Sequence, residues 1–410
     1  MRCAIVDAYG IGRFLPAALR RYGVEPIHVR SQFPDVHLKY QPEDFTVDIE
    51  HDGNIEETAE QLRQQRVDFV VAAMESGVLL ADALSAALGT PGNGMTRPAA
   101  RRDKYEMVQA VSNAGLAAAD SFASPAADDI VAWAEARGEW PVVLKPVASA
   151  GMDNVHFCSV ADEIRAGHAS ILGTTDRYGQ RNETALAQEY LAGDEYFVNT
   201  VSRAGVHHIV EIWRYRKHQI DKTRSMVSNE HPVPSDDPAA RQVGVYALGV
   251  LDALEIHNGA AHTEIMLTAN GPVLVECGAR LGGAHLPEIV SRSIGTNQID
   301  LLAQAMACPE DVTALRLPAY RLLNHVRFLN LIVPWDGVIP SEEGWAPVKA
   351  LDSFLELIVT QPAGKRIERT VDLASSPGYV YLSADDPMLV EADYARLREL
   401  ERLGLYDPQP

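Results

Sequence analysis

The chain has 410 residues, 47% of them hydrophobic and 22% charged, which is the composition of a globular protein with room for two to four domains. Its 36 basic and 56 acidic residues give a formal charge of −20, which argues against nucleic acid or an anionic membrane as the main partner. There is no signal-peptide pattern, no membrane-length apolar run and no C-x-x-C pair among the four scattered cysteines, so we expect a soluble cytoplasmic protein without a disulfide framework or a zinc site.

The first 95 residues alternate strand and helix patterns and predict an α/β domain. Asn54, with Glu57 three residues later, has the pattern of a helix-capping box, and Gly89 is placed to end the last helix. The expected elements are, in order, strand, helix, strand, helix, strand and helix over Cys3–Asp7, Phe14–Tyr22, Val24–Val29, Asn54–Gln65, Phe69–Met74 and Val78–Leu88.

The Pro/Gly-rich stretch TPGNGMTRP at residues 90–98 marks a boundary, and we expect domains over 1–95, 96–310 and 311–410. Residues 213–237 are polar and rich in turn formers, which predicts a loop that could be mobile. In the middle domain we expect helices over Pro98–Asn113, Asp128–Arg137, Ala239–Leu254 and Leu286–Ala307, and strands near Ser121, over Pro141–Pro146 and, three in number, within 185–212. In the last domain we expect strands within Arg321–Val333, Phe354–Val359 and Tyr379–Leu382 and a charged helix over Pro387–Leu403.

The stretch AAHTEIMLT-ANG-PVLVECG has the pattern of a β-hairpin, and the register of the hairpin decides which side chains meet. A two-residue Asn270-Gly271 loop would pair Glu264 with Cys277. A three-residue loop, with Gly271 in the left-handed conformation, would instead pair Glu264 with Glu276. Two carboxylates about 5 Å apart on one face repel each other unless a hard cation such as Mg²⁺ lies between them. The alternative is two unrelated acids at a solvated sheet edge, and Cys277 is expected to pack on the opposite face.

Lys145 ends the apolar strand VVLKP and is followed by a loop of small residues, VASAGMDNV. Backbone N–H groups at Ser149, Ala150 and Gly151 can cradle a phosphate, so a lysine beside this loop suggests a nucleotide site, although the sequence is not a P-loop. The ordinary alternatives are a snorkelling lysine at a strand end and, for Lys104 in RRDKYEM, a solvated lysine on a polar helix face.

The stretch AQEYLAGDEYFV predicts two strands with a short break between them. Backbone groups at such a break can meet the edge of an adenine, and Glu195, four residues beyond Leu191, can accept hydrogen bonds from ribose hydroxyls. The alternative is a turn between two strands with exposed acids.

The order of these features resembles that of the ATP-grasp superfamily of carboxylate–amine ligases, from Lys104 through Lys145, SAGMDNV and QEYL to the E-x-x-x-R run at Glu276–Arg280. The strings VVLKP and VECGARLGG and the strand-rich tail are most similar to L-amino acid ligases, which make dipeptides. The resemblance covers residues 1–310. It implies an ATP-grasp fold of mixed α/β and α+β class, with an N-terminal Rossmann-like domain, central ATP-grasp subdomains and a C-terminal strand-rich subdomain.

The resemblance also implies roles for individual residues. Glu264 and Glu276 would hold Mg²⁺, for which Mn²⁺ could substitute. Arg280 and Lys145 would be catalytic, with Arg280 binding the donor carboxylate and its acyl phosphate. Lys104 and Lys145 would contact the ATP phosphates, Lys145 also on the adenine side, and Ser149, Ala150 and Gly151 would belong to the lid over the triphosphate. Gln188, Glu189 and Leu191 would hold the adenine, and Glu195 the ribose.

Two positions depart from the family pattern. Many relatives read E-x-N-x-R, with the asparagine as a further metal ligand, whereas this chain has Gly278 there. Met152 stands where small polar residues are common in the lid loop. The basic run WRYRKHQIDKTR at 213–224 could close over the site or be a solvated loop, and Ala284 and His285 are expected to line the acceptor pocket.

The implied reaction joins the carboxylate of one L-amino acid to the amine of another through an acyl phosphate, giving a dipeptide, ADP and phosphate. Its partners would be small acids and amines, and a homodimer is compatible with it. One alternative is an ATP-grasp ligase that uses another acid or amine acceptor in a specialised-metabolite pathway, such as antibiotic biosynthesis. The alternative of another class is a non-catalytic nucleotide-binding module, against which the set Glu264, Glu276 and Arg280 argues. A biotin-dependent carboxylase is disfavoured, because no biotinyl segment is evident.

Overall fold

The computed structural model describes residues 1–32, 41–149, 153–176, 178–219, 225–283, 285–310, 320–373 and 375–407. Contacts divide the chain into two compact units. The first unit is Met1–Ile212, Ser235–Val290 and Thr296–Tyr320, and the second unit is Trp213–Pro234, Ser291–Gly295 and Arg321–Pro410. The division into 1–95, 96–310 and 311–410 stays a prediction.

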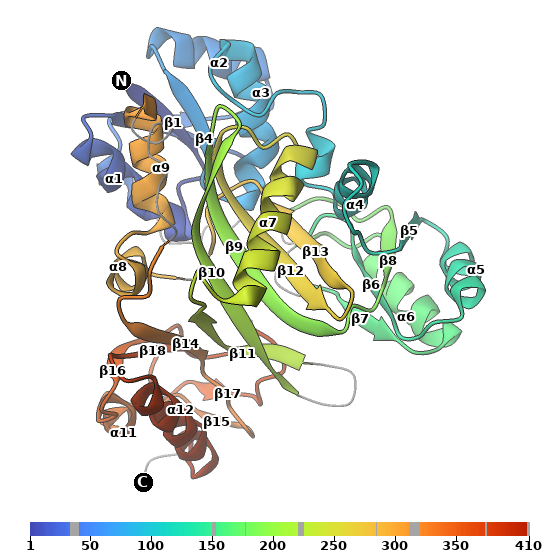
Figure 1. Ribbon diagram of the computed structural model, residues 1–410, viewed down its shortest axis with the longest axis vertical. Coiled ribbons are helices and arrows are strands. Elements are labelled where there is room, and N and C mark those ends of the chain that lie inside the picture. Colours follow the sequence, from blue (N-terminus) through green and yellow to red (C-terminus); the bar gives the residue numbers. More distant parts are fainter. Residues whose placement is uncertain are drawn as a thin grey trace. The chain divides into compact units, whose positions relative to one another are not determined.

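A parallel four-stranded sheet, in the order β3-β2-β1-β4, begins the first unit (Figure 1). Side chains of β1 and β2 pack against α2 and α3 in one apolar cluster. Asn54 caps α2 and Gly89 ends α3 in the left-handed conformation, as predicted. The elements are β1 Arg2–Val6, η1 Gly10–Phe14, α1 Leu15–Arg21, β2 Glu25–Arg30, η2 Pro42–Asp44, β3 Asp48–Glu50, α2 Ile55–Gln64, β4 Phe69–Ala72, η3 Glu75–Gly77 and α3 Val78–Leu88.

The turn η3 follows β4 closely, which places it at the carboxyl edge of the parallel strands. Open α/β sheets bind ligands at this edge. Glu75, the first residue of η3, is therefore in a position where a functional side chain is expected, although it is only 4% exposed.

The expected helix over Pro98–Asn113 is interrupted. A short turn, η4 Ala99–Arg101, is followed by helix α4 Lys104–Asn113, because the side chain of Asp103 accepts hydrogen bonds from the first N–H groups of α4 and starts the helix there. Lys104 is therefore the first residue of a helix rather than a residue within one.

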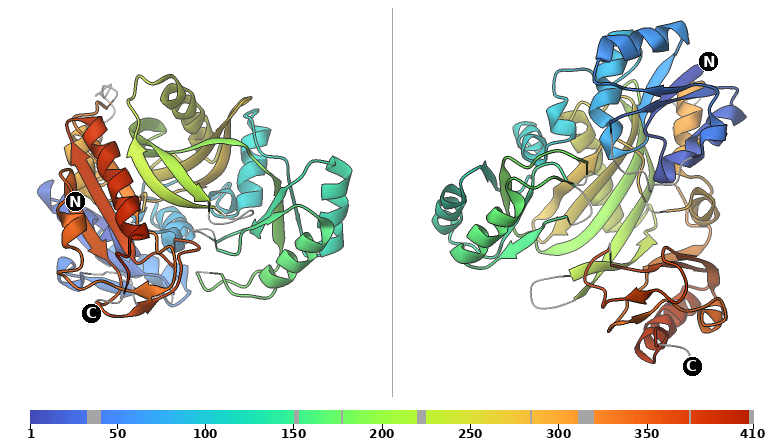
Figure 2. Two further views of the ribbon diagram at one scale, coloured as in Figure 1. Left: turned by 90° about the horizontal axis from the view of Figure 1, so that it is seen from below. Right: turned by 180° about the vertical axis from the view of Figure 1, so that it is seen from behind.

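A second, antiparallel sheet has the order β5-β8-β6-β7. Helices α5 and α6 pack side by side on one face of it, and the apolar residues of both helices form one cluster with β6 and β8 (Figure 2). Helix α6 and strand β7 were not expected from the sequence. The elements are β5 Ser121–Ser124, α5 Ala127–Arg137, β6 Val142–Pro146, β7 His156–Cys158, α6 Ala161–Ile171 and β8 Ala185–Glu189.

The third sheet has the order β13-β12-β9-β10 in the first unit, and helix α7 lies across one face of these strands (Figure 1). Strand β10 runs on into the second unit, where the order is β10-β11-β14-β18-β16 and α12 covers an apolar cluster on β14 and β18. The elements are β9 Gly193–Arg203, β10 Val206–Gln219, β11 Ser225–Pro232, α7 Pro238–Ala253, β12 Gly259–Thr268, β13 Gly271–Gly278, α8 Pro287–Ile294, α9 Gln298–Ala307, β14 His325–Asn330, β15 Gly337–Val338, α11 Ala346–Lys349, β16 Phe354–Val359, β17 Arg366–Ile367, β18 Gly378–Ala384 and α12 Pro387–Arg402.

The loop predicted over 213–237 is wrong for most of its length, because residues 213–219 and 225–232 lie in β10 and β11. The polar composition concealed the strands: Trp213 and Met226 are buried, but Arg214 and Arg216 alternate with Trp213 and Tyr215 along β10. Lys222 and Arg224 of the basic run lie outside the described residues.

All four cysteines are free thiols, and three of them are buried, as expected of core residues. In the part of the chain that the structure describes, no helix is both long and apolar enough to cross a membrane.

Candidate functional site

Glu264 and Glu276 lie directly opposite each other on the neighbouring strands β12 and β13. Directly opposed residues of an antiparallel pair project from the same face, so the two carboxylates face the same side of the sheet. The predicted pairing is confirmed. Cys277, one residue on, points to the other face, where it is buried against Thr263 at 3.3 Å, and burial raises the pKa of the Cys277 thiol to about 12.

The turn that joins the two strands differs from the prediction. Thr268 pairs with Gly271, so the loop has two residues, Ala269 and Asn270. Gly271 has φ +114°, a positive value that favours glycine. The register then shifts by one residue between the pairs Ile265–Leu274 and Glu264–Glu276, where Val275 is the extra residue of a β-bulge. A two-residue turn and a bulge together thus produce the same pairing that a three-residue turn would give.

Lys104 binds Glu276 and connects three segments of the first unit. Its Nζ lies 2.8 Å from Oε1 of Glu276 and also donates to the carbonyl oxygen of Ser149. The backbone N–H of Lys104 donates to the carbonyl of Val147 at 2.8 Å. The hydroxyl of Ser149 donates to Oδ2 of Asp153 at 2.6 Å. Helix α4, the loop after β6 and strand β13 therefore meet at one buried ammonium group.

Lys145 is buried near the end of β6. Burial lowers the pKa of Lys145 to about 8, Lys104 lowers it further, and Glu276, Glu264 and Glu195 oppose the shift. These interactions bring the two lysines and the three acids, which are separated in sequence, into one charged cluster. Buried amines with lowered pKa values are characteristic of functional sites.

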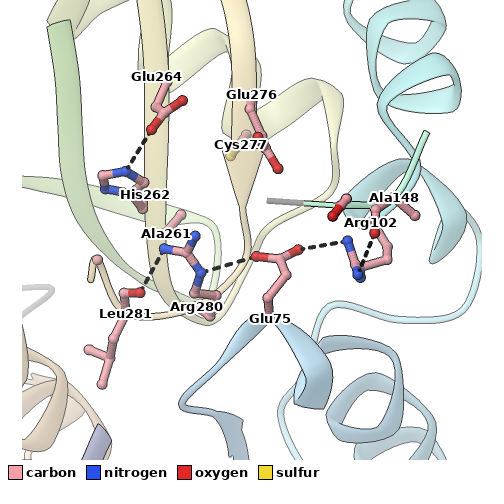
Figure 3. Close-up of polar contacts among 12 residues, drawn as sticks. Glu75, Arg102, Ala148, Ala261, His262, Glu264, Glu276, Cys277, Arg280 and Leu281 are labelled. Atoms are coloured by element: carbon pink, nitrogen blue, oxygen red, sulfur yellow. Dashed lines mark hydrogen bonds and ion pairs between the residues drawn. The ribbon is translucent and has the colours of Figure 1, made fainter. Parts of the chain in front are cut away.

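Arg280 lies two residues beyond the end of β13 and is held by the buried carboxylate of Glu75 in η3 (Figure 3). Its Nε donates to Oε2 of Glu75 at 3.0 Å, and its Nη1 donates to the carbonyl of Leu281 at 2.8 Å. Burial by itself would lower the pKa of Arg280, but Glu75 and other acidic neighbours raise it above its usual value. The guanidinium is therefore charged and oriented, and within the described residues its Nη2 group donates to no protein acceptor.

Glu75 also faces a second arginine. Oε1 of Glu75 lies 3.6 Å from Nη1 of Arg102, whose Nη2 donates to the carbonyl of Ala148 at 2.8 Å (Figure 3). The guanidinium of Arg102 lies 4.4 Å from the centre of the Tyr178 ring. Burial raises the pKa of Tyr178 to about 12, and the charge of Glu75 adds to this shift. The tyrosine is therefore neutral, and Glu75 is the central acid between two arginines.

Gly278 is explained by this arrangement. A Cβ atom at Gly278 would lie 2.8 Å from Oε2 of Glu75 and 3.1 Å from Cζ of Arg280. Any side chain at 278 would displace the ion pair, so the carboxylate of Glu75 occupies the space into which the expected asparagine would project.

A buried polar chain supports Glu264 from the interior of the sheet. Nδ2 of Asn199 donates to Oε1 of Glu211 at 2.7 Å, which turns Oδ1 of Asn199 toward Nδ1 of His262, also at 2.7 Å. Because the amide oxygen can only accept, Nδ1 of His262 carries the hydrogen. Nε2 of His262 lies 3.4 Å from Oε1 of Glu264 (Figure 3), and it can donate to this carboxylate only when both ring nitrogens carry a hydrogen. Three neighbouring strands thus define the position of one carboxylate.

The residues predicted to hold adenine have other partners in part. Nε2 of Gln188 donates to the hydroxyl of Ser121 at 3.0 Å. Glu189 accepts from the N–H of Asp120 at 3.0 Å and pairs with Arg137 at 3.4 Å. Leu191 lies in the break between β8 and β9, where backbone groups are not used by the sheet. The adenine roles stay predictions, and backbone groups at the break suit them better than these two side chains.

Some predicted site residues lie outside the described part of the chain. These are Ala150 and Gly151 of the lid loop, Met152 beside them, and Ala284. His285 is buried, with its ring centre 5.4 Å from that of Phe197 on the same face as Glu195.

The donor set fits a hard divalent cation that shares its coordination with phosphates and water. Glu264 and Glu276 offer carboxylate oxygens on one face, and Lys104 already compensates the charge of one of them. Among the described residues no group of three or more His, Cys, Asp or Glu side chains is arranged to hold a metal by itself. Gly278 is consistent with this small protein contribution, because it supplies no side-chain ligand.

The sequence did not reveal Glu75, Arg102, Tyr178 or the pair Asn199 and Glu211. The Arg280–Glu75 bond spans 205 residues, and no local pattern marks its acidic partner. One signal was present: an acid directly after the apolar strand FVVAAM, at the edge where parallel sheets bind ligands.

Residues 138–288 match the family model described as ATP-grasp domain. Dapdiamide A synthase of Enterobacter agglomerans is 32% identical, and the aligned region covers 98% of this chain and 97% of that protein. The L-arginine-specific L-amino acid ligase of Bacillus subtilis is 23% identical over 55% of this chain and 54% of its own length. Alanine–anticapsin ligase of Bacillus subtilis is also 23% identical, over 73% of this chain and 70% of its own length.

Solved structures show the same fold. The L-amino acid ligase from Bacillus licheniformis superimposes with a TM-score of 0.76 at 20% identity, covering 97% of both chains. An ADP complex of N5-carboxyaminoimidazole ribonucleotide synthetase superimposes with a TM-score of 0.69 at 15% identity, covering 98% of this chain and 97% of the other. The ATP-grasp fold predicted from the sequence is confirmed.

Proposed function

The chain belongs to the ATP-grasp ligases that form amide bonds with amino acids, and from this premise we propose that it joins the carboxylate of a donor acid to the amine of an L-amino acid at the expense of ATP. The observation that carries the proposal is the charged cluster formed by Glu264 of β12, Glu276 of β13, Lys104 of α4 and Lys145 of β6. Arg280, which a pure nucleotide-binding module does not need, lies two residues beyond the end of β13.

In the first step, an oxygen of the donor carboxylate attacks the γ-phosphorus of ATP, the bond to the bridging oxygen breaks and ADP leaves. Arg280 is suited to bind the donor carboxylate, because Glu75 holds its Nε and the Nη2 group can donate to a ligand. Lys145 is suited to stabilise the charge on the transferring phosphoryl group, since a buried ammonium acts more strongly than a solvated one.

In the second step, the amine nitrogen of the acceptor attacks the acyl carbon, phosphate leaves and the nitrogen loses a proton. Here Arg280 can follow the negative charge from the carboxylate to the departing phosphate, because its planar group binds both kinds of oxyanion. Glu75 would keep the arginine in one orientation through both steps.

Glu264 and Glu276 would hold Mg²⁺, which when bound neutralises phosphate charge and orients the triphosphate. The chain from Glu211 through Asn199 would keep the ring of His262 in place beside Glu264.

The decisive experiment measures phosphate release from ATP and Mg²⁺ in the presence of all pairs of the common L-amino acids, with products identified by mass. We expect at least one pair to give phosphate and a product of the combined mass less one water. The absence of phosphate release above background for every pair would contradict dipeptide synthesis.

A second candidate is a ligase of the same mechanism that takes a non-standard acid or amine in a specialised-metabolite pathway. The similarity to dapdiamide A synthase along almost the whole chain favours it. In the same assay, release with a non-proteinogenic acid as donor but with no standard pair would select this candidate over dipeptide synthesis.

A further inference from the structure

Basic side chains gather on one face of the sheet in the second unit. Arg214 of β10 pairs directly with His231 of β11, and Arg216 pairs with Asn229. Asn229 also pairs with Leu329 of β14, and Arg327 lies two positions before Leu329 on that strand. Because opposed residues and alternate residues of a strand share a face, these basic side chains all project from the same side. We call Arg214, Arg216, His231 and Arg327 the arginine cluster.

Arg327 is a buried cation with unsatisfied donors. It is only 8% exposed, and its Nη2 lies 2.6 Å from Glu391 of α12. Its Nε and Nη1 are buried and have no hydrogen-bond partner in the described chain. Leaving donors of a charged group buried and unpaired is unfavourable, and one carboxylate supplies too few acceptors for this guanidinium. In the part of the chain that the structure describes, two donors of Arg327 therefore lack an acceptor.

His231 likewise has a buried ring nitrogen, Nδ1, without a hydrogen-bond partner in the described residues. Burial lowers the pKa of His231 to about 3, and Arg327, Arg216 and Arg214 lower it further. The imidazole is therefore neutral near pH 7 and can donate one N–H to an anion.

Arg216 is the exposed member of the arginine cluster. It lies close enough to Arg327 to lower the pKa of that group, although burial is the larger cause. The concentration of positive charge is local, because the whole chain has a formal charge of −20. A small anion could thus reach the buried donors past Arg216.

We propose that the arginine cluster is a binding site for a small oxyanion, a carboxylate or phosphate group, held by Arg327, Arg216 and His231. Such a group has several acceptor atoms and would satisfy the buried donors of Arg327 and His231 together. A carboxylate would come from a substrate or product acid, and a phosphate from the medium or from ATP cleavage. The site uses no residue of the proposed ATP and metal cluster, so it stands whether or not the proposed reaction is correct.

The test is calorimetric titration of the full chain at constant ionic strength without ATP or Mg²⁺. The two probes are inorganic phosphate and N-acetylglycine, which carries a carboxylate but no amine. We expect saturable binding of at least one probe, with Kd on the order of 1 mM. R216A should weaken this binding about tenfold, and R327M should abolish it. Binding of phosphate alone or of N-acetylglycine alone identifies the source of the oxyanion.

Two controls separate this site from the rest of the molecule. R366A removes an exposed arginine of β17 in the same unit and should leave binding unchanged. R280M removes the arginine of the proposed active site, and the binding that R216A weakens should persist in it. R327M is interpreted only if its circular dichroism matches the parent chain, and R216A carries the test otherwise. Absence of saturable binding of both probes, or equal effects of R216A and R366A, would overturn the proposal.

Discussion

Glu276 has one attractive and one repulsive neighbour. It accepts a hydrogen bond from the ammonium group of Lys104, and it faces the carboxylate of Glu264 across the hairpin. A residue that both ligates a cation and pairs with a buried lysine should affect turnover more than folding. Lys104 has a second acceptor, the carbonyl of Ser149, so loss of one carboxylate charge leaves the ammonium partly satisfied.

We predict that E276Q lowers phosphate release about 100-fold or more, because the neutral amide binds a divalent cation poorly and the phosphoryl charge loses its compensation. The far-UV spectrum and the urea midpoint should change little. The comparison is with E356Q, a substitution of a strand glutamate in the second unit, which should keep full activity. Unchanged turnover in E276Q would refute the metal assignment.

Lys145 makes nucleotide affinity depend on pH. With its pKa lowered to about 8, the ligand-free amine is charged below pH 8 and neutral above it. Phosphate oxygens favour the charged form, so nucleotide binding above pH 8 takes up a proton and weakens as the pH rises.

We therefore predict that Kd for a non-hydrolysable ATP analogue is constant from pH 7 to the pKa and then rises by up to about tenfold per pH unit. Titration calorimetry in buffers of different ionisation enthalpy should report the proton uptake directly. K145R, which keeps its charge throughout this range, should lose the dependence. The same slope in K145R would assign the titration to another group.

Gly278 and Glu75 form a steric pair that a double-mutant cycle can test. A Cβ at 278 approaches Oε2 of Glu75 to 2.8 Å, so we predict that G278A destabilises the chain by about 2 kcal/mol. In the E75A background the same substitution should be nearly neutral, because the clashing carboxylate is gone. Urea unfolding of the four proteins measures the coupling, and equal effects in both backgrounds would contradict it.

At this scale the sequence was informative where chemistry follows chain order. Lys104, Lys145, Glu264 and Glu276 stood out because charged residues end apolar strands or face each other by register. Glu75 and Arg102 did not, because their importance comes from contacts with Arg280 and Ala148 across the fold. A lone acid or arginine near a strand end has many ordinary explanations.

At the scale of elements, the loop after β13 is anchored from a helix. Gln298, the first residue of α9, accepts from the N–H of Gly282 at 2.7 Å and donates to the carbonyls of Thr200 and Ala261, both at 2.9 Å. Gly282 follows Arg280 by two residues, so the buried side-chain amide of Gln298 helps to fix the position of Arg280.

We predict that Q298L lowers the free energy of unfolding by about 2–4 kcal/mol, because three buried backbone groups lose their partner. It should also raise KM for the donor acid more than it lowers kcat, since the arginine would be less well placed. Q304L, on the same helix at a half-buried position, serves as the control and should change stability by less than about 0.5 kcal/mol. Equal stability of the two variants would show that the anchor is unimportant.

Helices and strands with a strong hydrophobic pattern could be predicted from the sequence. Examples are α3 over Val78–Leu88 and β16 over Phe354–Val359, whose bounds match the expected ones. The errors occurred where tertiary contacts override composition. The segment 213–237 is polar, but β10 and β11 pair there, and their polar residues Ser228 and Asn229 are buried along with Trp213. The hairpin register was correct for a wrong reason, since no sequence rule located the bulge at Val275.

For the whole molecule, the division into two compact units assigns every described residue of the proposed ATP and metal cluster to the first unit. A ligand that binds only the folded state stabilises the unit that binds it against local unfolding. The fold class could be predicted from the order of motifs, whereas the boundaries of the units could not, because strand β10 belongs to both.

We predict that a non-hydrolysable ATP analogue with Mg²⁺ slows amide hydrogen exchange in peptides from 96–149 and 185–203. Peptides from 321–373 in the second unit should exchange as before. Hydrogen exchange with mass spectrometry measures both sets in one experiment, and protection confined to the second unit would place the nucleotide elsewhere.

The bulge at Val275 separates the tip of the hairpin from the carboxylates. Glu264 is also paired with Phe197 on β9, so its position does not depend on the turn. Ala269 and Asn270 at the tip are exposed and lie on the far side of the bulge. A fluorescent tag or a short peptide inserted between these two residues should therefore leave the two acids in register, which makes this turn a practical attachment point for following the enzyme during turnover.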